Sequence, residues 1–280
     1  MLVFLLEHYF MNSQENQQFL KVALIQTELY WKEKDANRAM FEELIENLGQ
    51  DVDMIVLPEM FTTGFTMEAE EVAEPTNFHT LKWMKQIAAQ KQALVTGSIV
   101  VKEGGDYYNR LLWVYPDGNY GFYDKRHLFR MADEDAHYTM GKERKVFEWK
   151  GWKIMPQVCY DLRFPVWSRN LVKENEMAYD FVYFVANWPA PRVSAWDILL
   201  QARAIENLAY AAGVNRIGQD GNKVPYVGHS AAYNFKGEVL GHCRDEDKAI
   251  IITLDKTALT AYREKFPAWL DADDFSIQVK

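Results

Sequence analysis

Three ionisable side chains stand at positions where the sequence predicts strands to end. Glu59 and Lys125 each follow an apolar or aromatic stretch, and Cys159 directly follows the run Ile154–Val158. Sites in α/β folds are commonly assembled from strand ends, and a thiol at the tip of a strand can act as a nucleophile. Each residue alone has a commoner explanation: a solvated turn carboxylate, a surface lysine, a small buried hydrophobe. Three such endings in one chain favour a shared site.

Composition restricts the kinds of function that this site can serve. The 280 residues are 49% hydrophobic and 25% charged, as in ordinary globular proteins, and the formal net charge of −9 argues against a general nucleic-acid or anionic-membrane binder. Two cysteines, Cys159 and Cys243, give no disulfide framework and favour a reducing, cytoplasmic location. No His-x-x-x-His or Cys-x-x-Cys pair occurs, so we expect no metal site.

The N-terminal residues are predicted to be an extension outside the fold. The apolar run Leu2–Leu6 is too short to span a membrane, and a basic start and a cleavage pattern of a signal peptide are missing. Met11 then opens a polar stretch and offers an alternative start. We therefore expect an extension over residues 1–20 and one domain over residues 21–280.

The first part of the chain alternates predicted strands and helices. Short apolar runs such as Asp53–Leu57 are typical of parallel strands covered on both faces. Asp35 is predicted to cap the first helix, whose apolar side chains recur at helical spacing. The order is strand Lys21–Thr27, helix 35–48, strand 53–57, helix 81–88 and strand Ala93–Val101. This β-α-β-α-β order favours an α/β layered fold.

The remainder adds many strands and one long helix. Turn sequences at Pro116–Asn119 and Lys150-Gly151 predict two hairpins, and Phe181–Ala186 reads as a buried strand. A capping pattern beginning at Ser194 predicts a helix that extends to Ala212. Further strands are expected over 214–217, 230–235, 238–242 and 249–254. About a dozen strands are too many for one doubly wound sheet, so we expect two mixed sheets packed face to face with helices outside.

Three blocks around the ionisable residues resemble the signature motifs of the nitrilase superfamily of carbon–nitrogen hydrolases. They are Leu57-Pro58-Glu59, Tyr123–Phe129 (YDKRHLF) and Cys159–Pro165 (CYDLRFP), and they occur in the family's order. Three further blocks resemble the omega-amidase branch: Met131–Glu134, Ala186–Arg192 and Arg203–Asn207. The resemblance runs from Lys21 to the C-terminus. It implies a four-layer α-β-β-α sandwich and a homodimer in which two sandwiches stack.

The resemblance also implies roles for the three residues in amide hydrolysis. Cys159 would attack the carboxamide carbon, and Glu59 would carry the proton from the thiol to departing ammonia. Lys125 and the backbone N–H of Tyr160 would stabilise the oxyanion. We also expect the nearby ammonium to favour the Cys159 thiolate. A thioester then hydrolyses to the acid, and the chemistry needs no cofactor and no metal.

Residues around this triad have supporting roles with open alternatives. Glu134 matches a family glutamate that positions the lysine, although it could be a solvated charge. Arg163 is expected to bind a substrate carboxylate, and its alternative is an ion pair with Asp161 or another acid; Arg192 is the next candidate reader of the carboxylate. Trp188 is expected to wall the pocket, although most tryptophans at strand ends belong to the core. Two further assignments are structural: an Arg203–Glu206 helix pair, and Cys243.

These features together predict a cytoplasmic omega-amidase. Its substrates would be small dicarboxylic monoamides such as 2-oxoglutaramate, and no nucleic-acid or membrane partner is expected. Another superfamily branch, a nitrilase or an N-carbamoyl amidohydrolase, is the main alternative. A non-catalytic binding protein that keeps the fold, or a thiol redox protein, fits the sequence less well, because all three residues of the triad are present and no resolving cysteine lies nearby.

Overall fold

The first of the two main sheets carries the predicted N-terminal strands. The computed structural model describes residues 18–75, 77–174, 176–246 and 248–279. In this sheet β1 (Phe19–Gln26) pairs in parallel with β2 (Met54–Val56), and β2 with β4 (Leu94–Glu103). The full order is β17-β1-β2-β4-β5-β6, with β3 (Glu74–Pro75) beside β4; the other bounds are Asp106–Val114 for β5, Tyr120–Asp124 for β6 and Lys248–Asp255 for β17.

The second sheet is built around three parallel strands from the middle of the chain. Its centre is β11 (Phe181–Ala186), which pairs with β8 (Trp152–Val158) on one side and with β12 (Tyr210–Asn215) on the other. The full order is β16-β15-β12-β11-β8-β7, where the outer strands are β7 (Phe147–Trp149), β15 (Ala231–Tyr233) and β16 (Val239–His242). β11 is buried along its whole length, as a strand covered on both faces must be.

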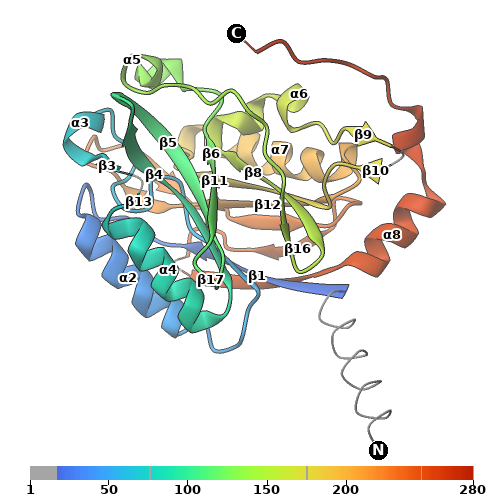
Figure 1. Ribbon diagram of the computed structural model, residues 1–280, viewed down its shortest axis with the longest axis horizontal. Coiled ribbons are helices and arrows are strands. Elements are labelled where there is room, and N and C mark those ends of the chain that lie inside the picture. Colours follow the sequence, from blue (N-terminus) through green and yellow to red (C-terminus); the bar gives the residue numbers. More distant parts are fainter. Residues whose placement is uncertain (1–17, 76, 175, 247, 280) are drawn as a thin grey trace, which may run out of the picture.

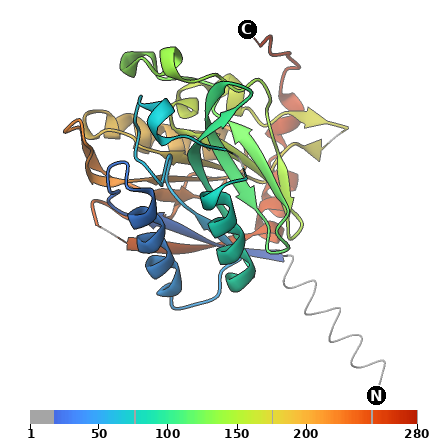
Figure 2. The same cartoon turned by 60° about the vertical axis from the view of Figure 1, so that its left-hand side comes forward.

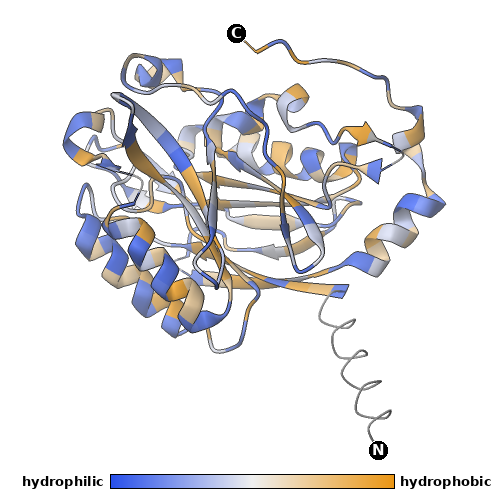
Figure 3. Cartoon of the chain, viewed as in Figure 1, coloured by the Kyte–Doolittle hydropathy of each residue, from blue (hydrophilic) through white to orange (hydrophobic). Residues whose placement is uncertain are grey.

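Helices cover the outer face of each sheet (Figures 1 and 2). α2 (Lys34–Glu46) and α4 (His79–Lys91) pack on the first sheet, whereas α7 (Val193–Glu206) packs on β12 and β15 of the second. Apolar side chains of both sheets form the core between them, and the hydrophobic colouring of the strands follows this arrangement (Figure 3). The structure is therefore the four-layer α-β-β-α sandwich that the sequence predicted.

Short elements complete the fold, and one longer helix near the C-terminus was not predicted. α8 (Lys256–Lys265) begins at Asp255, whose carboxylate accepts hydrogen bonds from the backbone N–H groups of Thr257 and Ala258. The short helices are α3 (Ala69–Val72), α5 (Glu134–His137), α6 (Pro165–Ser168), and the 3₁₀ turns η1 (Arg130–Ala132), η2 (Cys159–Arg163), η3 (Ala190–Arg192) and η4 (Ala268–Asp271). The short strand pairs are β9 (Val172–Lys173) with β10 (Glu176–Met177) and β13 (Ile217–Gln219) with β14 (Pro225–Val227).

The predicted helix over residues 194–212 was wrong in its second half. α7 ends at Glu206, the chain turns at Leu208, and Tyr210 begins β12. Ala211 and Ala212 were read as the end of the helix, but they belong to β12, and the missing side chain at Gly213 lets α7 lie close to that strand. A Cβ on Gly213 would come within 2.5 Å of Trp196 Cζ2 and 2.6 Å of Leu200 Cδ1. The predicted side-chain caps at Asp35 and Ser194 were also wrong, because neither side chain caps its helix.

The predicted N-terminal extension lies largely outside the described residues. Met11 and the segment 1–10 belong to that undescribed part. Phe19 and Leu20, which were assigned to the extension, are the first residues of β1 and pair with β17. No helix among the residues that the structure describes is long and apolar enough to cross a membrane.

One buried hydrogen bond joins the two sheets and allows a test of their packing. The hydroxyls of Thr96 on β4 and Tyr183 on β11 lie 2.7 Å apart. We predict that Tyr183→Phe and Thr96→Val each lower the free energy of unfolding by ~1–2 kcal/mol, since each removes one hydroxyl of the bond and leaves the other buried without its partner. In urea unfolding, the double variant should lose about as much as the larger single loss, because one bond is removed in every case. Fully additive losses would show that the two hydroxyls do not interact.

Candidate active site

Strand ends from both sheets bring Lys125 and Cys159 to one pocket, and Glu59 is buried against Lys125. Glu59 follows β2 and Lys125 follows β6 in the first sheet, whereas Cys159 follows β8 in the second. The cavity has a volume of about 270 Å³. Its lining combines Lys125, Cys159 and Asn187 with aromatic and charged side chains, namely Phe65, Phe129, Met131, Tyr160, Arg163, Trp188, Pro189 and Arg192. A small cavity of this kind suits a small-molecule substrate.

Lys125 is a buried ammonium held between two buried carboxylates. Its Nζ lies 2.9 Å from Glu59 Oε1 and 2.9 Å from both carboxylate oxygens of Glu134. All three side chains are at most 1% exposed. Burial opposes the charged lysine, but Glu134 and then Glu59 outweigh it and raise the pKa of Lys125. Lys125 is therefore a fixed positive charge rather than a proton carrier.

Glu59 is oriented by two asparagines. Asn109 Nδ2 donates to Glu59 Oε1 at 2.8 Å, and the backbone N–H of Asn187 donates to Oε2 at 2.8 Å. The Asn187 side chain also donates to the Glu59 carbonyl at 2.6 Å. Because Asn187 directly follows β11, these bonds join the Glu59 segment of the first sheet to the end of a strand in the second. The carboxylate is thus fixed in one orientation at the cavity.

Cys159 occupies a strained turn and carries a neutral thiol. Its φ of 43° lies in the left-handed region that side-chain-bearing residues rarely adopt, and Sγ lies 3.9 Å from the Asn187 carbonyl oxygen. Burial, with the Glu59 carboxylate adding to it, raises the pKa of the Cys159 thiol well above its ordinary value. Lys125 offsets only part of this effect. The expected effect of the ammonium is present, since Lys125 lowers the pKa of the thiol, but burial and Glu59 outweigh it and the thiol stays neutral.

Comparison with known sequences decides the family. The profile of the carbon–nitrogen hydrolase family matches residues 21–264, which is most of the chain. The chain belongs to this family. Among curated proteins, omega-amidase YafV of Escherichia coli is 50% identical over 92% of this chain and 98% of its own length. The 2-oxoglutaramate amidase of Bacillus subtilis is 30% identical over 89% of this chain and 96% of its own length.

A solved structure supports the same family membership. XC1258 from Xanthomonas campestris, described as a CN-hydrolase superfamily protein with an arsenic adduct in its active site, superimposes with a TM-score of 0.91. It is 43% identical, and the match covers 93% of this chain and 99% of that one. The nitrilase-superfamily resemblance predicted from the three sequence blocks is thus confirmed.

Arg163 and Arg192 of this hydrolase both line the cavity, and neither forms an ion pair with a carboxylate of the described residues. Arg163 lies over the Trp188 ring, with its Cζ 5.1 Å from the ring centroid. Arg192 lies over the Phe129 ring at 5.4 Å, and its Nη2 contacts Met131 Sδ at 2.7 Å. The alternative in which Arg163 pairs with Asp161 is wrong, because that carboxylate is occupied by other donors.

The remaining residues singled out in the sequence lie partly at the cavity and partly in the surrounding structure. The Arg203–Glu206 pair forms, with Nη1 and Oε1 2.8 Å apart. Glu134 is buried on Lys125 rather than solvated, as the resemblance implied. Trp188 lines the cavity and is also 3% exposed, so it serves both the pocket and the core. Cys243 is buried and unpaired, away from the lining residues.

Asn109 and Asn187 are the site residues that the sequence analysis missed. Asn187 lies inside the omega-amidase-like block Ala186–Arg192, so its position at a strand end was the signal that could have found it. Asn109 carries no such signal, because it stands within β5 and meets Glu59 only through the pairing of strands far apart in the sequence.

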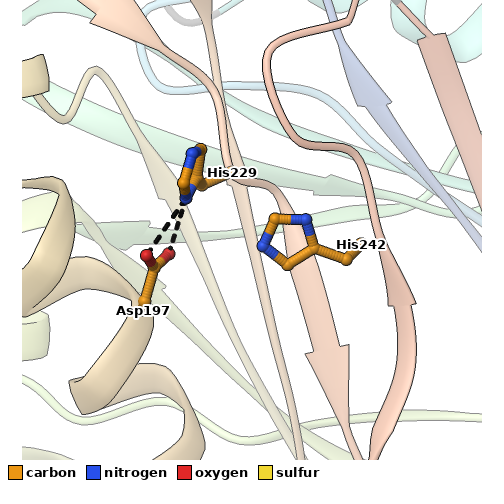
Figure 4. A group of neighbouring side chains, drawn as sticks. All are labelled: Asp197, His229 and His242. Atoms are coloured by element: carbon orange, nitrogen blue, oxygen red, sulfur yellow. Dashed lines mark hydrogen bonds and ion pairs between the residues drawn. The ribbon is translucent and has the colours of Figure 1, made fainter.

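A cluster of Asp197, His229 and His242 is the one group among the described residues whose ligand atoms lie close enough, within 4.8 Å, to hold a metal ion (Figure 4). His229 Nδ1 lies 3.1 Å from both Asp197 oxygens. The backbone N–H of Arg244 donates to His242 Nδ1 at 3.0 Å, which leaves the proton of a neutral ring on Nε2. Within this cluster His229 and Asp197 are therefore joined by a hydrogen bond, and His242 is held by the backbone of Arg244.

The raised pKa of Cys159 gives a prediction for its titration. In a difference titration of thiolate absorbance between proteins with and without Cys159→Ser, we expect no Cys159 thiolate below about pH 8.5, the ordinary cysteine pKa. A raised pKa keeps the neutral thiol to higher pH, so the signal should appear only above that value. Both proteins should carry Cys243→Ser, since burial raises the pKa of Cys243 to about 11 and its signal would overlap. A Cys159 signal that develops near neutral pH would contradict the buried, neutral thiol.

Proposed function

We propose that this carbon–nitrogen hydrolase is an omega-amidase that converts the terminal carboxamide of small dicarboxylic monoamides, such as 2-oxoglutaramate, to acid and ammonia. The observation that carries the proposal is one cavity that holds the Cys159 thiol beside the Glu59–Lys125–Glu134 ion cluster, together with two arginines that pair with no carboxylate of the described residues. The similarity to omega-amidase YafV and to a 2-oxoglutaramate amidase supports the same activity.

In the first half of the reaction Cys159 is the nucleophile. Because its thiol rests neutral, the proton must move as the sulfur attacks the amide carbon, and Glu59 is the acceptor. Lys125, with the backbone N–H of Tyr160, stabilises the negative charge that develops on the carbonyl oxygen. Glu59 then returns the proton to the nitrogen, the C–N bond breaks, ammonia leaves, and the acyl group remains on sulfur as a thioester.

In the second half a water molecule replaces ammonia. Glu59 removes a proton from the water as its oxygen attacks the thioester, and the same two donors stabilise the second oxyanion. The C–S bond breaks, Cys159 regains the proton, and the carboxylic acid departs. Glu134 holds Lys125 through both carboxylate oxygens, so the ammonium stays in place through both halves. These steps use no metal and no cofactor.

The two arginines supply the selectivity for a substrate with a second carboxylate. A guanidinium binds a carboxylate through two parallel hydrogen bonds, and charge-assisted bonds are stronger than neutral ones. Arg163 follows Cys159 by four residues within η2, so it is the first candidate, and Arg192 in η3 is the second. Arg163 is exposed and Arg192 is half-buried, and an aromatic ring lies under each guanidinium group.

We further propose that the protein acts as a cytoplasmic homodimer. Both cysteines are free, which suits a reducing compartment. The outer helical layer of the second sheet exposes Val166 on α6 and Ile198 and Ile205 on α7 at 55%, 66% and 48%, which supports pairing through this face. Sedimentation at micromolar concentration should give twice the chain mass; a monomer would contradict the dimer.

The catalytic proposal predicts the loss of turnover in three variants. Cys159→Ala, Glu59→Gln and Lys125→Ala should each lower ammonia release by about 10⁴-fold or more, because the three groups act as a unit. Lys125→Ala should also lower the free energy of unfolding by ~3–5 kcal/mol, since it leaves buried carboxylates unpaired. Cys243→Ala is the matched control and should keep full turnover. Near-normal rates in any of the three variants would remove that residue from the mechanism.

The substrate class is tested with the unmodified enzyme. Faster turnover of nitriles or N-carbamoyl amino acids than of ω-amides would favour another superfamily branch.

The selectivity proposal predicts the response to a neutral substrate analogue. Wild type should prefer the carboxylate-bearing amide over its remote methyl ester, and Arg163→Lys should lose about ten- to a hundredfold of that preference in kcat/KM, as expected for a charge-assisted bond of ~1.5–3 kcal/mol. Arg192→Lys is the matched variant, because it changes the second unpaired guanidinium of the same cavity. A loss of preference in Arg192→Lys alone would assign the carboxylate to Arg192. An unchanged preference in both variants would contradict recognition by either arginine.

A further inference from the structure

Asp161 is a fully buried carboxylate that accepts four hydrogen bonds. Oδ1 accepts from the backbone N–H of His127 at 2.9 Å and lies 2.8 Å from the Nδ1 of the same residue. Oδ2 accepts from the Tyr123 hydroxyl at 2.8 Å and from the backbone N–H of Val158 at 3.0 Å. None of these donors comes from the pocket lining, and the mechanism above does not use Asp161.

The four donors belong to residues that lie next to Lys125 and Cys159 in the sequence. Tyr123 stands two residues before Lys125 and His127 two residues after it, while Val158 directly precedes Cys159. Lys125 follows β6 of the first sheet and Cys159 follows β8 of the second, so no shared ladder of strand hydrogen bonds sets their separation. The Asp161 carboxylate connects both strand ends directly.

The surroundings of Asp161 hold this connection in place. The His127 ring stacks on Phe164 with centroids 3.7 Å apart, and Trp167 Nε1 donates to the Tyr123 hydroxyl at 2.9 Å. Asp161 also lies in the same 3₁₀ turn as Cys159, whose backbone is strained, and its bond to the Val158 N–H closes that turn from the inside. A strained residue persists only where its surroundings over-determine it.

We propose that Asp161 and His127 are positioning residues of the amidase, which fix the Lys125 ammonium at the correct distance from the Cys159 sulfur. The inference rests on the proposed function, in which Lys125 and Cys159 act on the same carbonyl group. Asp161 itself takes no part in the chemistry. Lys125 must meet an oxyanion that forms only after Cys159 has attacked, so their relative placement affects the transition state more than the bound substrate. A displacement of about 1 Å at such a site costs on the order of a hundredfold in rate.

Asp161→Asn is the most direct test, because the side chain keeps its size but has one acceptor oxygen. In either orientation its amide NH₂ group faces a backbone N–H, from His127 or from Val158, so one of these two backbone hydrogen bonds is lost. We expect kcat to fall by about a hundredfold while KM changes far less, since Lys125 meets an oxyanion that is present in the transition state and absent from the bound substrate.

Asp180→Asn is the matched control. Asp180 is another buried carboxylate, but it precedes β11, at the end of that strand opposite to Asn187, and pairs with Arg263 at 2.9 Å. It should lose thermal stability and keep kcat. A folded Asp161→Asn protein with the wild-type kcat, or a kcat loss of equal size in Asp180→Asn, would overturn the proposal.

A second pair of variants decides the question if Asp161→Asn does not fold. The side chain of His127 is 22% exposed, so its replacement is tolerated more easily. His127→Asn keeps a donor near the position of Nδ1, whereas His127→Leu removes it and keeps the backbone bond. We expect kcat to fall in the leucine variant and to be largely restored in the asparagine variant, and equal kcat values in the two would overturn the proposal.

The same measurements separate this inference from the function on which it rests. If Cys159→Ala keeps its turnover, the proposed mechanism fails and the positioning role fails with it. If Cys159→Ala is inactive while Asp161→Asn and His127→Leu match wild type, the amidase mechanism stands and only the positioning role is rejected.

Discussion

The site depends on a buried ammonium that two carboxylates hold in place. Removing Lys125, Glu59 and Glu134 from water carries a desolvation cost that only close pairing can offset, and the 2.9 Å contacts to both glutamates supply that pairing. A Cys159 thiolate would add a negative charge beside two buried carboxyl groups, which raise the pKa of the thiol. Moving the thiol proton to Glu59 leaves the total charge of the site unchanged, which explains how a neutral thiol can react without a resting thiolate.

The four-layer sandwich is what makes such a cluster possible. Glu59 and Cys159 follow the buried strands β2 and β8, whereas Lys125 follows β6 at the edge of the first sheet. The two sheets also have to be held in register, because the glutamate and lysine come from one and the cysteine from the other. At the site itself, the two sheets are joined by the Asn187–Glu59 bonds and by the four bonds of Asp161. Within the core they are joined by the Thr96–Tyr183 bond.

Sequence patterns predicted the strand ends that carry the site better than the contacts between its side chains. The apolar runs before Glu59 and Cys159 gave the strand ends, because a run of that length needs burial on both faces. The segment at 207–212 was misread because its alanines favour helix locally, while in the fold Ala211 and Ala212 belong to β12 and Gly213 allows the close approach of α7. The net state of the Cys159 thiol could not be predicted for a related reason: the sequence shows the nearby lysine, which lowers the pKa of the thiol, but not the burial that outweighs it. Contacts such as Asn109 with Glu59 depend on strand pairing across 50 residues, which no local pattern contains.

The central claim, covalent catalysis by Cys159, can be tested by trapping the acyl intermediate. An ester analogue of the ω-amide should acylate the thiol readily, because its alcohol leaves more easily than ammonia, and the thioester should then accumulate. The account predicts that intact-protein mass after rapid acid quench increases by the mass of the acyl group, that the increase maps to the peptide containing Cys159, and that Cys159→Ala shows none. Turnover without this adduct, or an adduct on another residue, would contradict the account.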